Sequence, residues 1–359
     1  MASQRTLVLA AATGVVTGAG VAAFEWVTRE QIFERVVAAP LAGRAAALVV
    51  GLLAAAAALA WIAGGATPAT ADEYIRNFHE PDRGLSSRPA AGRMLAGVAT
   101  LGGGGALGFE GPSLYLGAVV GSWVQARWSR LFSRDETKVL MVAGAAAGVA
   151  AIFKAPATGA VFALEVPYRD DTARRMLLPA LVGSVTGYLT FVALLGTAPL
   201  FEIDGTPPFD LQELGGAAVL GLVCGLGARG FARMVGVAKR WSVRGHPAGR
   251  ALLGGAALVV LLVTSDAVFG EGLATGSGYR TLEWVTEAHG VGLIVALLAF
   301  RLVATGATIA AGGVGGLFIP LVLAGALVGD AAAVALDDTT NLFPLIGVAA
   351  LGRGSPSPA

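Results

Sequence analysis

The chain has 359 residues, of which 55% are hydrophobic and only 14% are charged, and its mean hydropathy is +0.71. Soluble domains carry about 25% charged residues, so this composition excludes a water-soluble globular protein and predicts a membrane protein. The net charge of +1 gives no sign of a polyanionic partner such as nucleic acid, the single Cys224 excludes an intrachain disulfide, and the three scattered histidines argue against a metal centre.

Long apolar runs recur along the chain and predict membrane-spanning helices. A transmembrane helix needs about 20 predominantly apolar residues to cross roughly 30 Å of hydrocarbon. The first run, residues 7–24, reaches this length and contains no convincing cleavage site, so we interpret it as a membrane helix rather than a signal peptide. Further runs of this kind are residues 45–63, 176–195, 252–264 with its flanks, and 291–311.

Two glycine-rich clusters interrupt this pattern. Each cluster, at residues 101–111 and 312–316, leads into a proline and then into small residues spaced four apart. The two clusters match at a constant offset of 208 positions, which indicates an internal repeat. The matched pairs are Pro112 with Pro320, Gly117 with Gly325, and Gly121 with Gly329.

Both clusters predict a helix that begins inside the membrane. A glycine run does not hold a helix, because each glycine costs about 1 kcal/mol there, whereas a proline fits the first turn of a new helix. Unwound backbone at membrane depth persists only where it is buried or lines a watery space, and a helix N-terminus attracts anions through its free N–H groups and its dipole. Paired broken helices in two repeats mark a transport site. The alternative, that the glycines serve only close helix packing, stays open.

At these residues the chain resembles the CLC family of chloride channels and proton-coupled chloride transporters. Residues 108–112 (GFEGP) resemble the family's G(K/R)EGP motif, residues 316–320 (GLFIP) resemble GxFxP, and residues 64–68 (GGATP) are similar to GSGxP. Further similarities are residues 144–156 and the pair Arg301 and Thr305 ahead of the second glycine cluster. The resemblance covers nearly the whole chain, with the motifs in the family's order.

The resemblance implies a role for each motif. Glu110 would be the gating glutamate, whose side chain occupies an anion site when ionised and leaves it when protonated; the alternative is a simple cap for the following helix. The backbone N–H groups of Leu317 and Phe318 would bind a central anion, and those of Phe109 and Glu110 a more external one. The other anion-binding residues that the resemblance implies are Gly65, Ala66, Thr67 and Gly111.

The chain departs from the family's pattern at two positions of these motifs. Gly65 stands where the family has a serine whose hydroxyl contacts the anion, so a hydroxyl would have to come from elsewhere, with Thr67 and Thr70 as the candidates. Phe109 replaces the basic residue of G(K/R)EGP, which removes a positive charge from the outer mouth of the path.

Two further departures concern mechanism and extent. The resemblance matches Glu165 with a family glutamate, but Val166 stands where many exchangers carry an inner proton-relay glutamate, so this position favours a passive channel. Residues 343–350 resemble the stretch near Gly144 in the first repeat, and the chain ends soon afterwards. We therefore expect the family's last helices to be absent and the second repeat to be incomplete.

These observations predict an all-α, multi-pass protein of the cell membrane, built as two inverted repeats with broken re-entrant helices. We expect the first repeat at residues 1–200 and the second at 201–359. The expected function is transport of chloride or similar small anions as a voltage-gated-type CLC channel. We expect no enzyme activity, no cofactor, no metal and no nucleic-acid partner, and the resemblance implies a homodimer in the lipid bilayer.

Two alternatives to the channel remain open. The first is a proton-coupled chloride or fluoride antiporter, which coupled proton movement would distinguish from a channel. The second, from another class, is a non-conducting membrane scaffold, in which Glu110 could be changed without loss of any flux. A phosphate-binding loop is not indicated, because no glycine run leads into a Gly-Lys-Ser or Gly-Lys-Thr sequence.

Overall fold

The computed structural model describes residues 4–80, 84–132, 138–168, 174–198, 211–285, 287, 289–335, 344, 346, 347 and 349. Within these residues every regular element is a helix. In chain order the helices are α1 (Gln4–Glu25), which continues through a π-helical stretch (Trp26–Phe33) into α2 (Glu34–Ala38), α3 (Leu41–Ala57) with a π-helical end (Ala58–Ile62), α4 (Ala71–His79), α5 (Ser87–Gly102), α6 (Glu110–Arg127), α7 (Val139–Phe153), α8 (Pro156–Glu165), α9 (Leu177–Leu195), α10 (Leu211–Trp241), α11 (Pro247–Phe269), α12 (Tyr279–Val285), α13 (Val291–Ala310) and α14 (Phe318–Ala335).

Seven of the described helices are long and apolar enough to cross a membrane. Their outward faces carry large apolar side chains, such as Leu222 on α10 and Leu253 on α11, which are 68% and 76% exposed. Apolar surface of this extent is unfavourable in water but is matched by lipid tails. The chain is therefore a multi-pass membrane protein, as its composition predicts.

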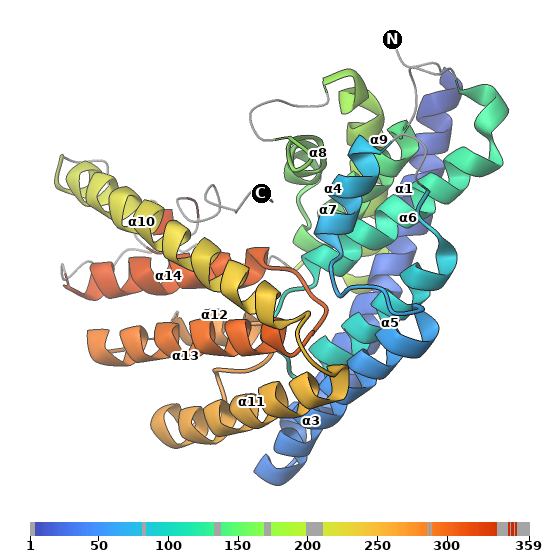
Figure 1. The fold of residues 1–359 in the computed structure, drawn as a ribbon. Coiled ribbons are helices and arrows are strands. Elements are labelled where there is room, and N and C mark those ends of the chain that lie inside the picture. Colours follow the sequence, from blue (N-terminus) through green and yellow to red (C-terminus); the bar gives the residue numbers. More distant parts are fainter. Residues whose placement is uncertain are drawn as a thin grey trace.

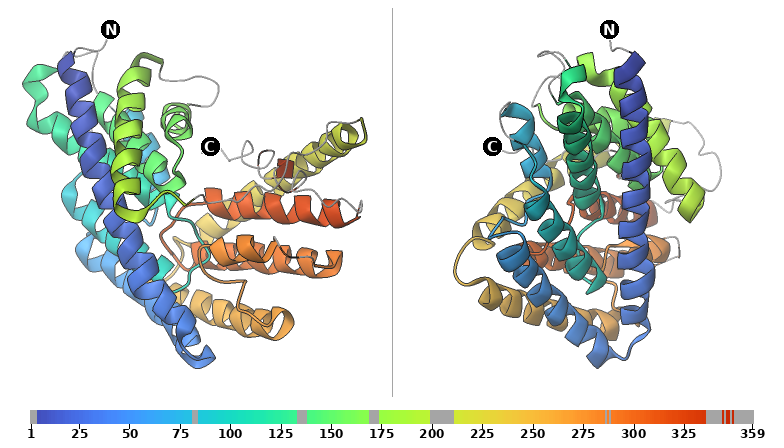
Figure 2. Two further views of the ribbon diagram at one scale, coloured as in Figure 1. Left: turned by 180° about the vertical axis from the view of Figure 1, so that it is seen from behind. Right: turned by 90° about the vertical axis from the view of Figure 1, so that its right-hand side faces the viewer.

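The helices form two groups that meet near the middle of the molecule (Figure 1). In the first group α1, α6, α7 and α9 pack against one another, and α8 lies against α7 and α9. In the second group α10, α11, α13 and α14 run across the direction of α1 (Figures 1 and 2). At one edge, α3 contacts α5 and also α11 of the second group.

Glycines allow the centre of the first group to pack closely. Between α6 and α7, a Cβ added to Gly117, Gly121, Gly144 or Gly148 would overlap a backbone oxygen of the facing helix. Helices in lipid gain stability from such close backbone approach, because it increases van der Waals contact. The spacing of small residues four apart, read from the sequence, is therefore used for packing here.

Both predicted helix breaks are present. The chain leaves α5 after Gly102, turns at Gly104 with φ of +97°, and starts α6 only at Glu110. It leaves α13 after Ala310, turns at Gly312 with φ of +86°, and starts α14 at Phe318. Positive φ is the conformation that glycine adopts without penalty, so the glycine clusters explain where the helices stop.

The two breaks are bonded to each other in a reciprocal way. Gly108 and Gly316 form an antiparallel bridge, with N–H to O distances of 2.9 and 2.7 Å. The hydroxyl of Thr308 on α13 accepts from the Ala106 N–H at 3.1 Å. Thr100 on α5 does the same for the Val314 N–H, also at 3.1 Å. Each break thus has its buried backbone groups satisfied by the other repeat.

The predicted all-helical fold with broken helices is confirmed for the described residues. The proposed boundary between repeats at residues 200 and 201 lies outside them and stays a prediction. The expected incomplete end of the second repeat also lies outside them, apart from Pro344, Ile346, Gly347 and Ala349.

Candidate functional site

The side chain of Glu110 joins the two broken helices. Glu110 is the first residue of α6, and its Oε1 accepts hydrogen bonds from the backbone N–H groups of Phe318 and Ile319, at 2.6 and 3.2 Å. These are the first two residues of α14. A carboxylate at a helix N-terminus is bound by free N–H groups and by the helix dipole, as an inorganic anion would be.

The carboxylate is enclosed. Glu110 is only 4% exposed, and its second oxygen, Oε2, has no hydrogen-bond partner among the described residues. Gly108 and Gly316 lie directly against the carboxyl group, because a Cβ added to either residue would overlap it. The two glycines of the cross-repeat bridge therefore leave a space that the carboxylate fills.

Aromatic rings surround this space. The Phe318 ring contacts Phe153 and Phe162, with ring centroids 4.9 and 6.0 Å apart. Phe109, which is 2% exposed, packs edge-on against Phe24 and stacks on Tyr279 at 6.3 Å. The site is consequently a set of backbone N–H groups within an apolar shell, in which an ionic hydrogen bond is stronger than in water.

The structure brings together most of the residues that the sequence singles out near Glu110. Phe109, Gly111 and Phe318 are adjacent to the carboxylate by sequence or by hydrogen bond. Leu317 directly precedes α14, and the amide pair that binds Glu110 starts one residue later than the predicted pair, at Phe318 and Ile319.

The stretch that resembles GSGxP is arranged differently. Gly65 and Thr67 are exposed, Ala66 is partly buried, and a Cβ added to Gly65 would meet nothing within 4 Å. Thr67 contributes its carbonyl oxygen to the buried Arg93, at 3.0 Å. No contact between these three residues and the Glu110 carboxylate is found within the described chain.

Thr70, rather than Thr67, lies beside the site. It is 4% exposed and precedes α4, but its hydroxyl does not cap that helix. A Cβ added to Gly111 would lie 2.8 Å from the Thr70 hydroxyl oxygen and 3.1 Å from Cα of Gly316. Two further neighbours, Ile319 and Tyr279, could not be identified from the motifs, because neither carries a motif signal of its own.

A buried ion pair holds the α4 side of the site in place. Arg93 on α5 is 4% exposed and contacts Glu73 on α4 at 3.3 Å. It also donates to the hydroxyl of Tyr115 on α6, at 2.8 Å. Because a buried charge is stable only when it is paired and hydrogen-bonded, this cluster fixes α4, α5 and α6 relative to one another.

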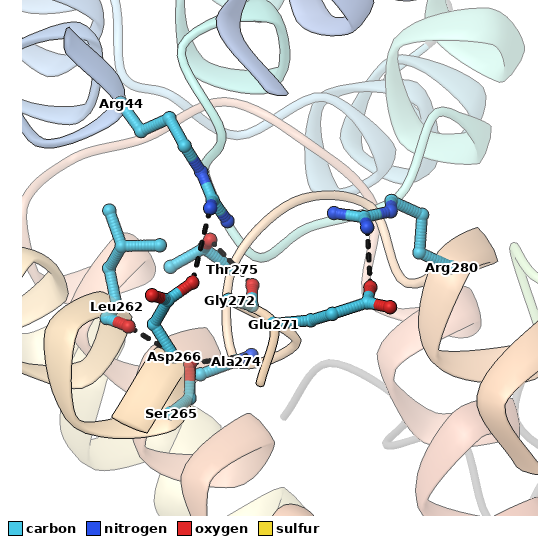
Figure 3. A network of polar contacts seen from close by, with 9 residues as sticks. All are labelled: Arg44, Leu262, Ser265, Asp266, Glu271, Gly272, Ala274, Thr275 and Arg280. Atoms are coloured by element: carbon cyan, nitrogen blue, oxygen red, sulfur yellow. Dashed lines mark hydrogen bonds and ion pairs between the residues drawn. The ribbon is translucent and has the colours of Figure 1, made fainter. Parts of the chain in front are cut away.

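The segment between α11 and α12 is held by two ion pairs (Figure 3). Asp266 pairs with Arg44 on α3 at 3.2 Å, and Glu271 pairs with Arg280. From α13, the buried Arg301 donates through Nη1 to four backbone carbonyls of this segment, at 3.0–3.3 Å; they belong to Leu273, Ala274, Thr275 and Gly276. The Gly276 N–H then binds the carbonyl of Gly104 at 2.7 Å, which ties the segment to the first helix break.

Curated relatives are similar in sequence to this chain over part of their length. A putative ClcB-like chloride channel protein of Ralstonia nicotianae is 28% identical over 270 residues, which cover 72% of this chain and 60% of the relative. The H(+)/Cl(-) exchange transporter ClcA of Salmonella arizonae is 27% identical over 266 residues, or 70% of this chain and 53% of the relative. The chain thus spans little more than half the length of these proteins.

Solved structures share the fold. A CLC-type fluoride/proton antiporter superimposes with a TM-score of 0.81 at 23% identity, covering 99% of this chain and 88% of the other. A slow cyanobacterial Cl-/H+ antiporter gives the same TM-score at 18% identity, with coverage of 99% and 95%. The broken helices that meet at Glu110 are therefore part of an architecture shared with CLC proteins. The family model for voltage-gated chloride channels matches residues 46–354, and the chain belongs to that family.

Proposed function

We propose that this protein moves small anions, chloride in the first place, across the membrane in exchange for protons, with Glu110 as the group that binds the proton. The observation that carries this proposal is the double hydrogen bond from Phe318 and Ile319 to Oε1 of Glu110. An anion and the carboxylate have the same donors, so only one of them binds there at a time.

The competition between carboxylate and anion for the same N–H groups explains why a proton takes part. A carboxylate accepts charge-assisted hydrogen bonds that are about twice as strong as neutral ones. Protonation of Glu110 removes the charge, weakens its hold on the two N–H groups and lets an anion replace it. In an exchange cycle the proton comes from the side to which the anion leaves, and the carboxyl group then releases that proton to the opposite side as it returns. Each replacement of carboxylate by anion is thereby linked to the binding of one proton.

Most of the named relatives favour this antiporter over the channel expected from Val166, although the relative from Ralstonia is named a putative chloride channel protein. The relative from Salmonella is named an exchange transporter, and both solved structures quoted above are antiporters. Val166 follows the end of α8 and carries no proton-binding group, so an antiporter needs another route by which the proton reaches Glu110. We also propose that the protein forms the homodimer that the resemblance implies. The mass of the purified protein in detergent tests this.

Flux measurements in proteoliposomes test the proposal. Chloride and pH are recorded together for the unmodified chain, for Glu110→Gln and for the control Glu287→Gln, which changes an exposed carboxylate outside the site. We expect coupled chloride and proton movement in the unmodified chain and the control, and loss of proton movement in Glu110→Gln with chloride flux retained. Chloride flux without protons in the unmodified chain would instead establish a channel. Absence of flux in all three proteins would refute transport and favour the scaffold.

A further inference from the structure

A cavity of about 230 Å³ has in its wall Tyr279, whose ring stacks on Phe109 next to the candidate site. Residues of the π-helical stretch after α1, of α2, of α3 and of the turn after α5 line its wall, together with residues 272–283. It has room for several water molecules and is lined partly by polar groups, as a hydrated space must be. Two lining residues, Glu34 and Glu283, are exposed, so the cavity communicates with the surface.

The charged groups of this cavity favour weak and reversible binding of an anion. Three arginines line it, Arg29, Arg44 and Arg280. Each is already paired with a carboxylate: Arg29 with Glu25 at 3.4 Å, and the other two through the pairs shown in Figure 3. Paired guanidinium groups offer an anion weak binding, and a conducting path needs binding that is weak enough to allow release.

Two ring contacts and one peptide bond connect the cavity to Glu110. The guanidinium of Arg29 lies over the Tyr279 ring, 5.2 Å from its centroid. The Tyr279 ring also stacks on Phe109, with an interplanar angle of 28°. Phe109 directly precedes Glu110. The two stacked rings therefore lead from the wall of the charged cavity to the residue that precedes Glu110.

The backbone around Tyr279 is firmly held on one side and adaptable on the other. Arg301 binds the carbonyls of residues 273–276. Gly276 and Gly278, with φ of +79° and +103°, precede Tyr279, and glycine permits backbone rotation at little steric cost. The ring sits at the start of α12, where a change of its rotamer disturbs no long helix.

We propose that this cavity is an antechamber for water and small anions, and that the stacked rings of Tyr279 and Phe109 form the lid between it and Glu110. This inference rests on the proposed function for the identity of the ion. The lid itself is a statement about access, which is measured without any transport.

Cysteine accessibility in detergent tests the antechamber first. The single native cysteine, Cys224, is buried and is replaced by alanine to give a thiol-free background. Ser277→Cys places a thiol in the cavity wall, and Ser184→Cys places one at a buried position of α9 as a matched control. We expect a charged methanethiosulfonate reagent to modify the first variant at least tenfold faster than the second. Equal rates would overturn the antechamber.

The lid is tested by the access of the same reagent to position 110. In the Glu110→Cys variant, adding Tyr279→Ala should raise the modification rate at least tenfold, because removal of the ring opens the way from the cavity. Tyr279→Phe keeps the stack and should leave the rate unchanged. The control Tyr188→Ala removes a half-buried tyrosine of α9 and should also have no effect. An unchanged rate in Tyr279→Ala would refute the lid.

The two proposals fail in different ways. Faster labelling in Tyr279→Ala together with absent chloride flux would support the lid and refute the transport function. Coupled flux without any effect of Tyr279→Ala on labelling would support transport and refute the lid. Should Tyr279→Ala not fold, Tyr279→Leu removes the stack while keeping an apolar side chain, and the same comparison applies.

Discussion

Replacing Gly316 by alanine should create a conflict with the side chain of Glu110, whose atoms are the three nearest to the added Cβ. A Cβ at residue 316 has the carboxyl group of Glu110 as its nearest neighbour and would overlap it. Gly316 is not among the glycines with positive φ, so its backbone accepts alanine without strain. Either the carboxylate or the bridge between Gly108 and Gly316 must therefore give way.

Movement of the carboxylate and opening of the bridge each lower the free energy of unfolding by an amount that follows from the bonds lost. If the carboxylate leaves, two hydrogen bonds to a charged acceptor are lost, at about 1.5–3 kcal/mol each. If the bridge opens, two neutral backbone bonds are lost at about 0.5–1.5 kcal/mol each, and the freed buried groups add about 1–3 kcal/mol apiece. Loss of the carboxylate contacts costs less, about 3–6 kcal/mol in total, and the lower bound of about 3 kcal/mol sets the smallest expected effect. Removing the carboxylate first, with Glu110→Ala, should abolish most of this cost.

A double-mutant cycle measures how much the effect of Gly316→Ala depends on the Glu110 carboxylate, because residues in direct contact give non-additive effects. With an unfolding entropy of about 2.1 cal/mol/K per residue, 3 kcal/mol corresponds to about 4 °C in a chain of 359 residues. Gly316→Ala should thus lower the melting temperature in detergent by about 4 °C more in the unmodified chain than in the Glu110→Ala chain.

The matched control for this cycle is Gly105→Ala. A Cβ at residue 105 would meet Thr100 and Thr308 instead of the carboxylate. Its effect on the melting temperature should therefore be the same with and without Glu110. If Gly316→Ala also has the same effect in both chains, the carboxylate does not occupy the space between the two glycines and the competition argument fails.

Three further predictions follow from other contacts. Thr70→Val should weaken chloride binding in calorimetry by about 10- to 100-fold, the worth of one hydrogen bond to a charged group, whereas Thr70→Ser should bind as the unmodified chain does; equal affinity for all three would place the Thr70 hydroxyl outside the site. Arg301→Met should speed hydrogen exchange of amides in residues 272–279, because the carbonyl anchors of that segment are lost, and Arg301→Lys should restore part of the protection; unchanged exchange would show that other bonds hold the segment. Gly121→Leu should prevent recovery of folded protein in size-exclusion chromatography, since its side chain would overlap α7, while Gly215→Leu, which meets no neighbour, should not.

The helix breaks could be predicted from the sequence because glycine and proline act locally. The residues after each break set where a helix stops and starts, and no distant contact is needed. The position of Glu110 at a helix start follows from the same local rule. Its partner could be placed on the second cluster by the repeat alone, but the choice of Phe318 and Ile319 depends on how far the side chain reaches across the bridge.

The repeat also extends further than the glycine pattern shows. Thr100 and Thr308 differ by the same offset of 208, and so do their partners Ala106 and Val314. A search for matched polar residues at that offset could have identified this pair. Tyr279 could not be identified so, since its contact with Phe109 joins segments 170 residues apart without a repeat relation.

The reciprocal bonds between the repeats bear on how such a site works. Each break is held by a threonine of the other repeat and by the bridge between Gly108 and Gly316, so the backbone that presents the Phe318 and Ile319 amides is anchored on both sides. In contrast, Oε2 of Glu110 has no partner, and the side chain is fixed through Oε1 alone. The group with the fewest restraints is therefore the carboxylate. Exchange of the carboxylate for an anion then requires only a movement of the Glu110 side chain, while the backbone donors stay in place. One proton sets the charge of the Glu110 carboxyl group, and this charge decides whether the carboxyl group or the anion is bound.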